Sequence, residues 1–118
     1  MPTNGRRALG SFGEALAARW YEARGYEVMD RNWRTAGGEI DLVLRRRHEL
    51  VFCEVKTRTS DRFGSPAESV TLAKQRRLRR LAAAYLAAFE PSRPRPGVVR
   101  FDVACVKGGR VEVIEHAF

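Results

Sequence analysis

The sequence predicts a mixed α/β domain with its elements in the order αβββαββ, and three observations predict it. Apolar residues recur at steps of three and four in two long segments, which is typical of amphipathic helices. Short apolar runs bounded by glycine, proline and polar residues follow each of these segments, which is typical of strands. The chain has 118 residues, 44% of them hydrophobic, which is enough for one core. We therefore expect a single domain over residues 1–118.

The first helix is predicted from large apolar residues that form one stripe. They are Leu9, Phe12, Leu16 and Trp20. Gly25 is expected to end this helix, because glycine readily takes the backbone conformation that follows a helix C-terminus. The segment from Tyr26 to Arg31 then predicts a short strand.

A hairpin is predicted next, because Gly37 and Gly38 mark a turn before two apolar runs. The runs cover residues 39–45 and 50–56, with a basic loop between them.

A polar loop over residues 59–66 precedes a second helix, predicted over residues 66–90 from its Ala, Leu and Arg content. Prolines follow this helix. Two further strands are predicted over residues 98–106 and 111–115, joined by the turn sequence KGGR.

The hairpin carries acids in otherwise apolar strands, and the alternation of side chains along a strand shows where they point. With the hairpin centred between residues 47 and 48, Asp41 lies opposite Glu54 and Glu39 lies opposite Lys56. All four then share one face. Two opposed carboxylates repel each other unless a positive group lies between them, so a divalent cation beside Lys56 is one explanation. An exposed face with an ordinary Glu39–Lys56 pair is the other.

The charge balance points to polyanionic partners. Twenty-two Lys and Arg against fourteen Asp and Glu give a formal net charge of +8 and a pI near 10.5, which favours nucleic acid, with an anionic membrane second. The sequence has no apolar run of membrane-spanning length and no apolar core of a secretory signal at its start, so a cytoplasmic protein without a membrane partner is expected.

Basic side chains cluster in two segments that are candidates for contacts to nucleic-acid phosphates. They are Arg45, Arg46 and Arg47 in the hairpin loop, and Lys74, Arg76 and Arg77 in the second helix. The alternative for the helix is that the stems of Lys74 and Arg77 cover the edge of the core while their charges reach solvent. Arg100 and Asp102 are expected to pair with each other on one face of their strand.

The pattern D-x(12)-E-x-K, after a helix that bears a glutamate, resembles the PD-(D/E)xK nuclease superfamily, with Ile40 in place of the proline. The chain is more closely similar to the YraN-like family of uncharacterised bacterial proteins, which resembles archaeal Holliday-junction resolvases. The matching stretches, in order, are GSFGEALAARW, GYEVMDRNWR, GGEIDLV, VFCEVKTR, GSPAESVTLAKQRRL and RFDVACV.

This resemblance implies a restriction-endonuclease-like fold and a Mg²⁺ or Mn²⁺ site. Asp41 and Glu54 are then the metal ligands with the backbone carbonyl of Val55, and Lys56 is the catalytic lysine. Glu14 matches a glutamate that some resolvase-like members add to the metal site, although Ser11 and Glu14 also fit a helix capping box.

The implied activity is metal-dependent cleavage of DNA phosphodiesters, including those of branched recombination or repair intermediates. A module that binds nucleic acid or a protein without turnover is the alternative on the same scaffold. A second copy of the chain and a DNA-processing protein are the protein partners that the sequence leaves open.

Overall fold

The computed structural model describes residues 5–58, 70–89 and 93–118, with side chains from residue 11 onward. Its elements occur in the order αβββαββ, which confirms the predicted order, and their bounds are α1 Gly5–Glu22, β1 Glu27–Thr35, β2 Gly38–Arg46, β3 Glu49–Arg58, α2 Leu72–Ala87, β4 Val98–Lys107 and β5 Arg110–Ile114. The predicted loop at 59–66 lies outside the described residues. The second helix, predicted over residues 66–90, is shorter and covers residues 72–87. Thr71 caps α2 by accepting a hydrogen bond from the Lys74 backbone N–H at 3.3 Å.

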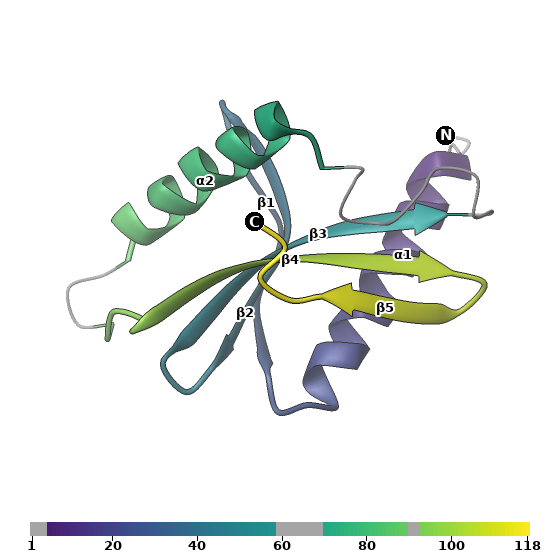
Figure 1. The fold of residues 1–118 in the computed structure, drawn as a ribbon, viewed down its shortest axis with the longest axis horizontal. Coiled ribbons are helices and arrows are strands. Elements are labelled where there is room, and N and C mark those ends of the chain that lie inside the picture. The colour runs from purple at the N-terminus through teal and green to yellow at the C-terminus, as the bar shows by residue number, and fades with distance from the viewer. Residues whose placement is uncertain (1–4, 59–69, 90–92) are drawn as a thin grey trace.

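The strands form one mixed sheet in the order β1-β2-β3-β4-β5, in which β3 and β4 are parallel and the other pairs antiparallel. A parallel pair requires a crossover connection, and α2 lies within it. The two helices pack on opposite faces, because alternate residues of β3 join different cores (Figure 1). Leu50 and Phe52 pack with α2, whereas Val51 and Cys53 pack with α1.

The buried face of α1 differs from the predicted stripe. Phe12 is 55% exposed, and the helix buries its small residues and one tyrosine instead: Gly13, Ala17, Ala18 and Tyr21. The prediction was wrong for Phe12 because it ranked large apolar residues above small ones. Leu16 and Trp20 are half-buried, Trp20 packs against the core beneath α1, and the side chain of Leu9 lies outside the described residues. A face of small residues lets the helix backbone lie closer to the sheet, and Tyr21 adds a large apolar ring.

The predicted register of the hairpin is confirmed over the paired residues. Arg46 pairs with Glu49 across a two-residue turn, and the ladder continues to Leu42 and Cys53. Arg47 has a φ of 57° in this turn, a left-handed conformation that is uncommon for a residue with a β-carbon.

The ladder between β2 and β3 ends at Leu42 and Cys53, although both strands continue. Beyond this point β2 stays paired with β1 as far as Gly38, and β3 stays paired with β4 as far as Arg58. The two strands therefore part, and we call the region between residues 39–41 of β2 and residues 54–56 of β3 the fork. Ile40 accordingly packs with the α2 core rather than with Leu42, a departure from the simple alternation expected from sequence.

A buried ion pair fixes β4 beneath α1, as the sequence predicted for Arg100 and Asp102. Asp102 is fully buried and accepts hydrogen bonds from Arg100 Nε at 2.9 Å and from the Tyr21 hydroxyl at 2.7 Å. Arg100 also donates to the Tyr26 hydroxyl at 2.9 Å. Because both charges have several partners, the pair links α1 to the centre of the sheet without an orphaned charge.

Neither α1 nor α2 is both long and apolar enough to cross a membrane, over the part of the chain that the structure describes.

The close approach of α1 to β3 makes Gly13 a sensitive position. A β-carbon added there would overlap Thr57 Oγ1 and lie 3.2 Å from Thr57 Cβ. Gly13→Ala should therefore lower the free energy of unfolding by about 1–3 kcal/mol, because the helix or the strand must shift. Urea unfolding measures this change. Thr57→Ala should restore part of the loss in the double variant, and a fully stable Gly13→Ala single variant would contradict the packing of α1 described above.

Candidate metal centre at the fork

Asp41 is the centre of the candidate site, since it reaches across the fork. Its Oδ2 accepts a hydrogen bond from the backbone N–H of Val55 at 2.8 Å, which ties β2 to β3 where their own ladder has ended. In an extended strand the N–H and C=O of one residue point to the same side. The carbonyl of Val55, the third ligand that the family resemblance implied, is therefore directed to the Asp41 side of β3.

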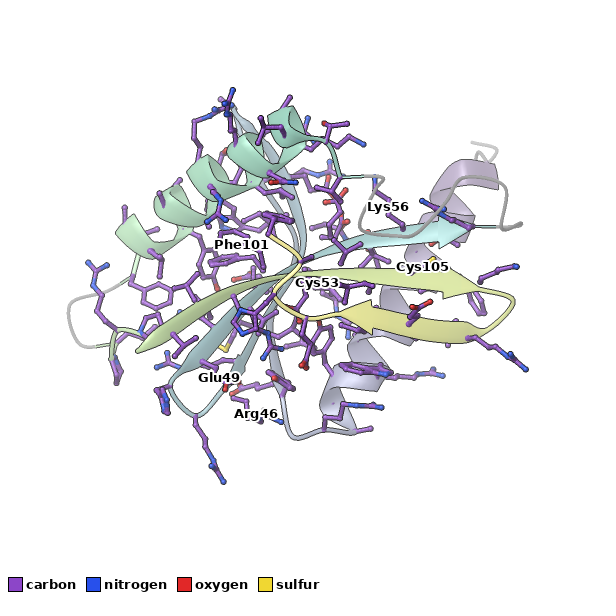
Figure 2. The ribbon with its side chains drawn as sticks, viewed as in Figure 1. Arg46, Glu49, Cys53, Lys56, Phe101 and Cys105 are labelled. Atoms are coloured by element: carbon purple, nitrogen blue, oxygen red, sulfur yellow. The ribbon has the colours of Figure 1, made fainter. Side chains whose placement is uncertain are left out.

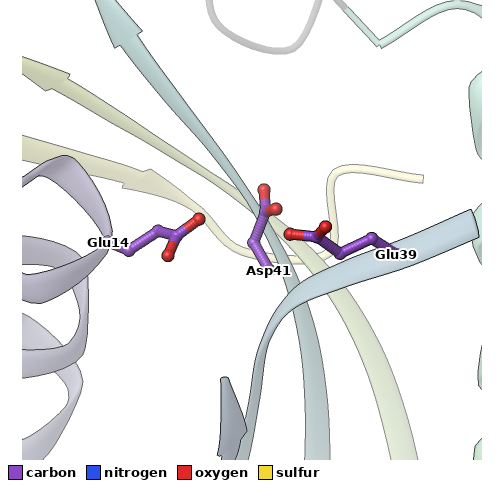
Figure 3. A group of neighbouring side chains, drawn as sticks. All are labelled: Glu14, Glu39 and Asp41. Atoms are coloured by element: carbon purple, nitrogen blue, oxygen red, sulfur yellow. The ribbon is translucent and has the colours of Figure 1, made fainter. Parts of the chain in front are cut away.

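Three carboxylates converge at the fork. Glu14 of α1 and Glu39 and Asp41 of β2 each offer an oxygen, and these oxygens lie within 4.8 Å of one another (Figure 3). All three side chains are half-buried. Asn32 of β1 holds Glu14 in this position, because its amide donates to Glu14 Oε2 at 3.0 Å.

The crowding of acids changes their proton affinity. Burial, together with the charges of Glu54, Glu14 and Glu39, raises the pKa of Asp41 to about 7, against the lowering effect of the Val55 hydrogen bond. Burial likewise raises the pKa of Glu14, against the lowering effect of the hydrogen bond from Asn32. Without a cation, Asp41 therefore keeps its proton to a pH well above the ordinary range of an aspartate.

The ion pairs at the fork correct one prediction from sequence. Glu39 pairs with Arg34 of β1 at 2.9 Å, and Lys56 pairs with Glu54 at 3.3 Å on its own strand, so the expected Glu39–Lys56 pair does not form. The divergence of β2 and β3 explains the change, because residues beyond the last pair, Leu42 and Cys53, are no longer paired across the two strands. Lys56 and Glu54 both keep less than a quarter of their side-chain surface exposed.

A second lysine approaches the fork from α2. The close approach of the Lys56 ammonium and its positive charge lower the pKa of Lys74. Lys74 lies one turn before Leu78 and thus on the same side of α2 as the buried residues, and the charge of Glu54 acts on its pKa.

The other predicted basic residues lie elsewhere. Arg76 and Arg77 are exposed on α2, with the stem of Arg77 lying along Gly38. The side chains of Arg45 and Arg46 are engaged at the far end of the hairpin from the fork, where Arg45 donates to Pro94 O at 3.1 Å and Arg46 to Arg24 O at 3.0 Å.

The donor set at the fork suits a hard divalent cation. Mg²⁺ and Mn²⁺ prefer oxygen ligands, and Mg²⁺ commonly uses one or two carboxylates together with water and substrate phosphate. Asp41 and Glu14 supply carboxylate oxygens on facing elements. Glu54 is close enough for its charge to be the second largest influence on the pKa of Asp41.

Asn32 is a site residue that the sequence analysis did not identify. Its φ of 51° is one that asparagine tolerates better than most residues. An asparagine at this position is therefore consistent with the backbone conformation, but nothing in the sequence indicates its hydrogen bond to Glu14. That contact depends on α1 lying beside β1, which periodicity along a single element does not show.

Comparison with known proteins identifies relatives along nearly the whole chain. Residues 13–106 match the family model described as "Uncharacterised protein family UPF0102". A UPF0102 protein of Frankia alni is 49% identical over 123 aligned residues, which cover 100% of each chain. A UPF0102 protein of Beutenbergia cavernae is 52% identical over 92% of each chain. One of Symbiobacterium thermophilum is 48% identical over 95% of this chain and 97% of its own.

The raised pKa of Asp41 predicts how stability depends on pH. Between the ordinary value of 3.8 and about 7, the folded protein retains a proton that the unfolded chain has lost. The free energy of unfolding should therefore fall as pH rises through this interval. In metal-free buffer at pH 8, Asp41→Asn should be more stable than wild type by about 1–3 kcal/mol.

Urea unfolding at pH 5 and pH 8 in EDTA measures this dependence. Glu112→Gln, which removes an exposed carboxylate on β5, is the matched control and should keep the wild-type pH dependence. An Asp41→Asn variant with the same fall in stability as wild type would contradict the placement of Asp41 among the acids.

Proposed function

Because the chain belongs to the uncharacterised protein family UPF0102, whose description assigns no activity, we propose a function from the site itself: a divalent-metal-dependent nuclease-like hydrolase that acts on DNA phosphodiesters. The observation that carries the proposal is the convergence of Glu14, Glu39 and Asp41 at the fork of a protein with a net charge of +8. A basic protein that only binds a polyanion has no use for an acidic cluster facing its ligand. A divalent cation bound by the acids would offset the repulsion between their carboxylates and a negatively charged phosphate.

Asp41 and Glu54 hold the cation in this proposal, with Glu14 and the carbonyl of Val55 completing the protein ligands. Glu39 is the weaker candidate, since Arg34 already neutralises it. Bound Mg²⁺ or Mn²⁺ supplies charge for the phosphodiester oxygens and acidifies a water molecule that it binds. The restriction-endonuclease-like fold implied by the sequence belongs to this same proposal, and the mixed sheet between two helices is compatible with it.

Lys56 acts on the phosphate in this proposal. Its ammonium lies 3.3 Å from Glu54, beside the ligands rather than among them, where it orients the attacking water or neutralises charge that develops on the phosphate oxygens. Lys74, which contacts Lys56, provides a second cation for the substrate backbone. Arg76 and Arg77 add two exposed cations of α2 to this positive surface.

A module that binds nucleic acid or a protein partner without turnover is the second candidate. The net charge of +8 favours it equally, because phosphate binding does not itself require a metal. Either candidate can act on branched DNA. Either can also work as a homodimer or together with a DNA-processing protein. Experiments that score binding and cleavage separately distinguish the two candidates.

Replacing Lys56 separates catalysis from binding. Lys56→Ala should lower the rate of DNA cleavage by about 100-fold or more, because it removes a charge that acts on the transition state. Its dissociation constant for DNA should change by less than about threefold, since Lys56 is one phosphate contact among several. The measurement compares cleavage and binding of branched and linear DNA with Mg²⁺ and with Mn²⁺.

Two controls accompany this comparison. Arg110→Ala removes an exposed cation on the β4–β5 turn and should leave both properties unchanged, whereas Asp41→Asn should abolish cleavage and keep the fold. Normal cleavage by Lys56→Ala would refute the catalytic role. A wild-type protein that binds DNA and cuts no substrate with either metal would favour the binding module.

A further inference from the structure

A hollow of about 650 Å³ lies at the end of the sheet away from the fork. Its lining residues come from the turn after α1 and from the β2–β3 turn: Arg24, Gly25, Arg46, Arg47, His48 and Glu49. We call it the arginine hollow. Figure 2 shows Arg46 and Glu49 at the opposite end of the sheet from Lys56.

Aromatic rings and backbone carbonyls hold two of its arginines in place. The guanidinium of Arg24 stacks 3.6 Å from the centre of the Trp20 ring and donates to the Trp20 carbonyl at 2.9 Å. Arg46 lies 4.3 Å above the Tyr26 ring and donates to the Arg24 carbonyl at 3.0 Å. These contacts order the two guanidinium groups before any ligand arrives, so less side-chain entropy is lost on binding.

The hollow keeps an excess of positive charge. Glu49 is the one acid among its lining residues, and Arg46 neutralises it at 3.5 Å. Arg100 also lies 3.5 Å from Glu49, but its charge is already paired with Asp102. Arg24 and the exposed Arg47 remain in excess. Planar guanidinium groups in this arrangement suit a phosphate, whose oxygens accept paired hydrogen bonds.

The spacing between the hollow and the fork matches a polynucleotide. The pair Arg46 and Glu49 lies five residues along the hairpin from Asp41 and Glu54. At about 3.3 Å per residue this separation is about 16 Å. That is about two to three phosphates along one DNA strand, because successive phosphates also wind around the axis and are therefore further apart than the rise of about 3.4 Å. Both places border α1, the fork through Glu14 and the hollow through Arg24.

We propose that the arginine hollow binds a backbone phosphate of the same nucleic acid whose scissile phosphodiester lies at the fork, about two to three nucleotides away. The inference rests on the proposed function for the identity of the ligand. It assigns the hairpin arginines a distant anchoring contact and no part in the chemistry. A polynucleotide then needs to extend several nucleotides to one side of the cleavage point to bind fully.

Two substitutions test the hollow. Arg47→Asn removes a charge and keeps a residue that tolerates the φ of 57° at this turn, and Arg24→Gln removes the charge beside Trp20. Arg110→Gln, on the β4–β5 turn, is the control for net charge. All are compared with wild type by titration of a 20-base-pair duplex in EDTA, across a range of salt concentrations, so that no outcome depends on cleavage.

Arg47→Asn and Arg24→Gln should each raise the dissociation constant about three- to tenfold and lower the slope of log K against log salt by about 0.9 for each lost contact. Arg110→Gln should change the dissociation constant by less than about twofold. If Arg24→Gln is unfolded in a thermal melt because its stacking on Trp20 is lost, Arg47→Asn decides the test alone.

Duplex binding by both variants equal to that of Arg110→Gln would overturn the inference, and cleavage by wild type would then leave the proposed function standing. Arg47→Asn and Arg24→Gln could lose affinity for the duplex while Arg110→Gln keeps it and the wild type cuts no DNA with Mg²⁺ or Mn²⁺. That result would support phosphate binding at the hollow and refute the hydrolase. Wild-type binding to vesicles of anionic lipid with none to the duplex would also overturn the inference, in favour of a membrane surface.

Discussion

The separation of β2 from β3 beyond Leu42 and Cys53 is the constraint on which the candidate site depends. While two strands are paired, their backbone groups satisfy each other and opposed acids merely repel. Where they part, the Val55 N–H loses its strand partner and takes the carboxylate of Asp41 instead. The fork thereby turns a side chain into a bridge between strands and leaves room for further acids from neighbouring elements.

The rest of the fold supports this arrangement from both faces. On one face α1 presents small residues to the sheet, and Gly13 lets its backbone approach Thr57 closely enough to bring Glu14 to the acids. The buried contact of Tyr21 with Asp102 fixes the same helix further along. On the other face the first turn of α2 brings Lys74 to Lys56. The charges of the fork are therefore set by packing contacts that lie outside it.

Local patterns in the sequence were sufficient for the element order, the hairpin register and the Arg100–Asp102 pair, because each depends on alternation or turns within adjacent segments. They failed where the answer depends on how close two elements lie. The stripe predicted for α1 placed Phe12 in the core, yet the small residues beside Glu14 form the contact face. The alternative of a Glu39–Lys56 pair assumed that the β2–β3 ladder continued. The Asn32–Glu14 contact could not be predicted because it joins segments far apart in the chain, and the same holds for the arginine hollow.

Diffraction from crystals of wild type and Asp41→Asn soaked in Mn²⁺ tests the central claim, that the fork holds a divalent cation. In the wild type we predict an anomalous peak at about 2.1 Å from an oxygen of Asp41, with further ligands from the acids around it. The peak should be lost in Asp41→Asn crystals under the same conditions. Wild-type crystals with no peak at the fork at millimolar Mn²⁺, or an equal peak in both proteins, would contradict the account.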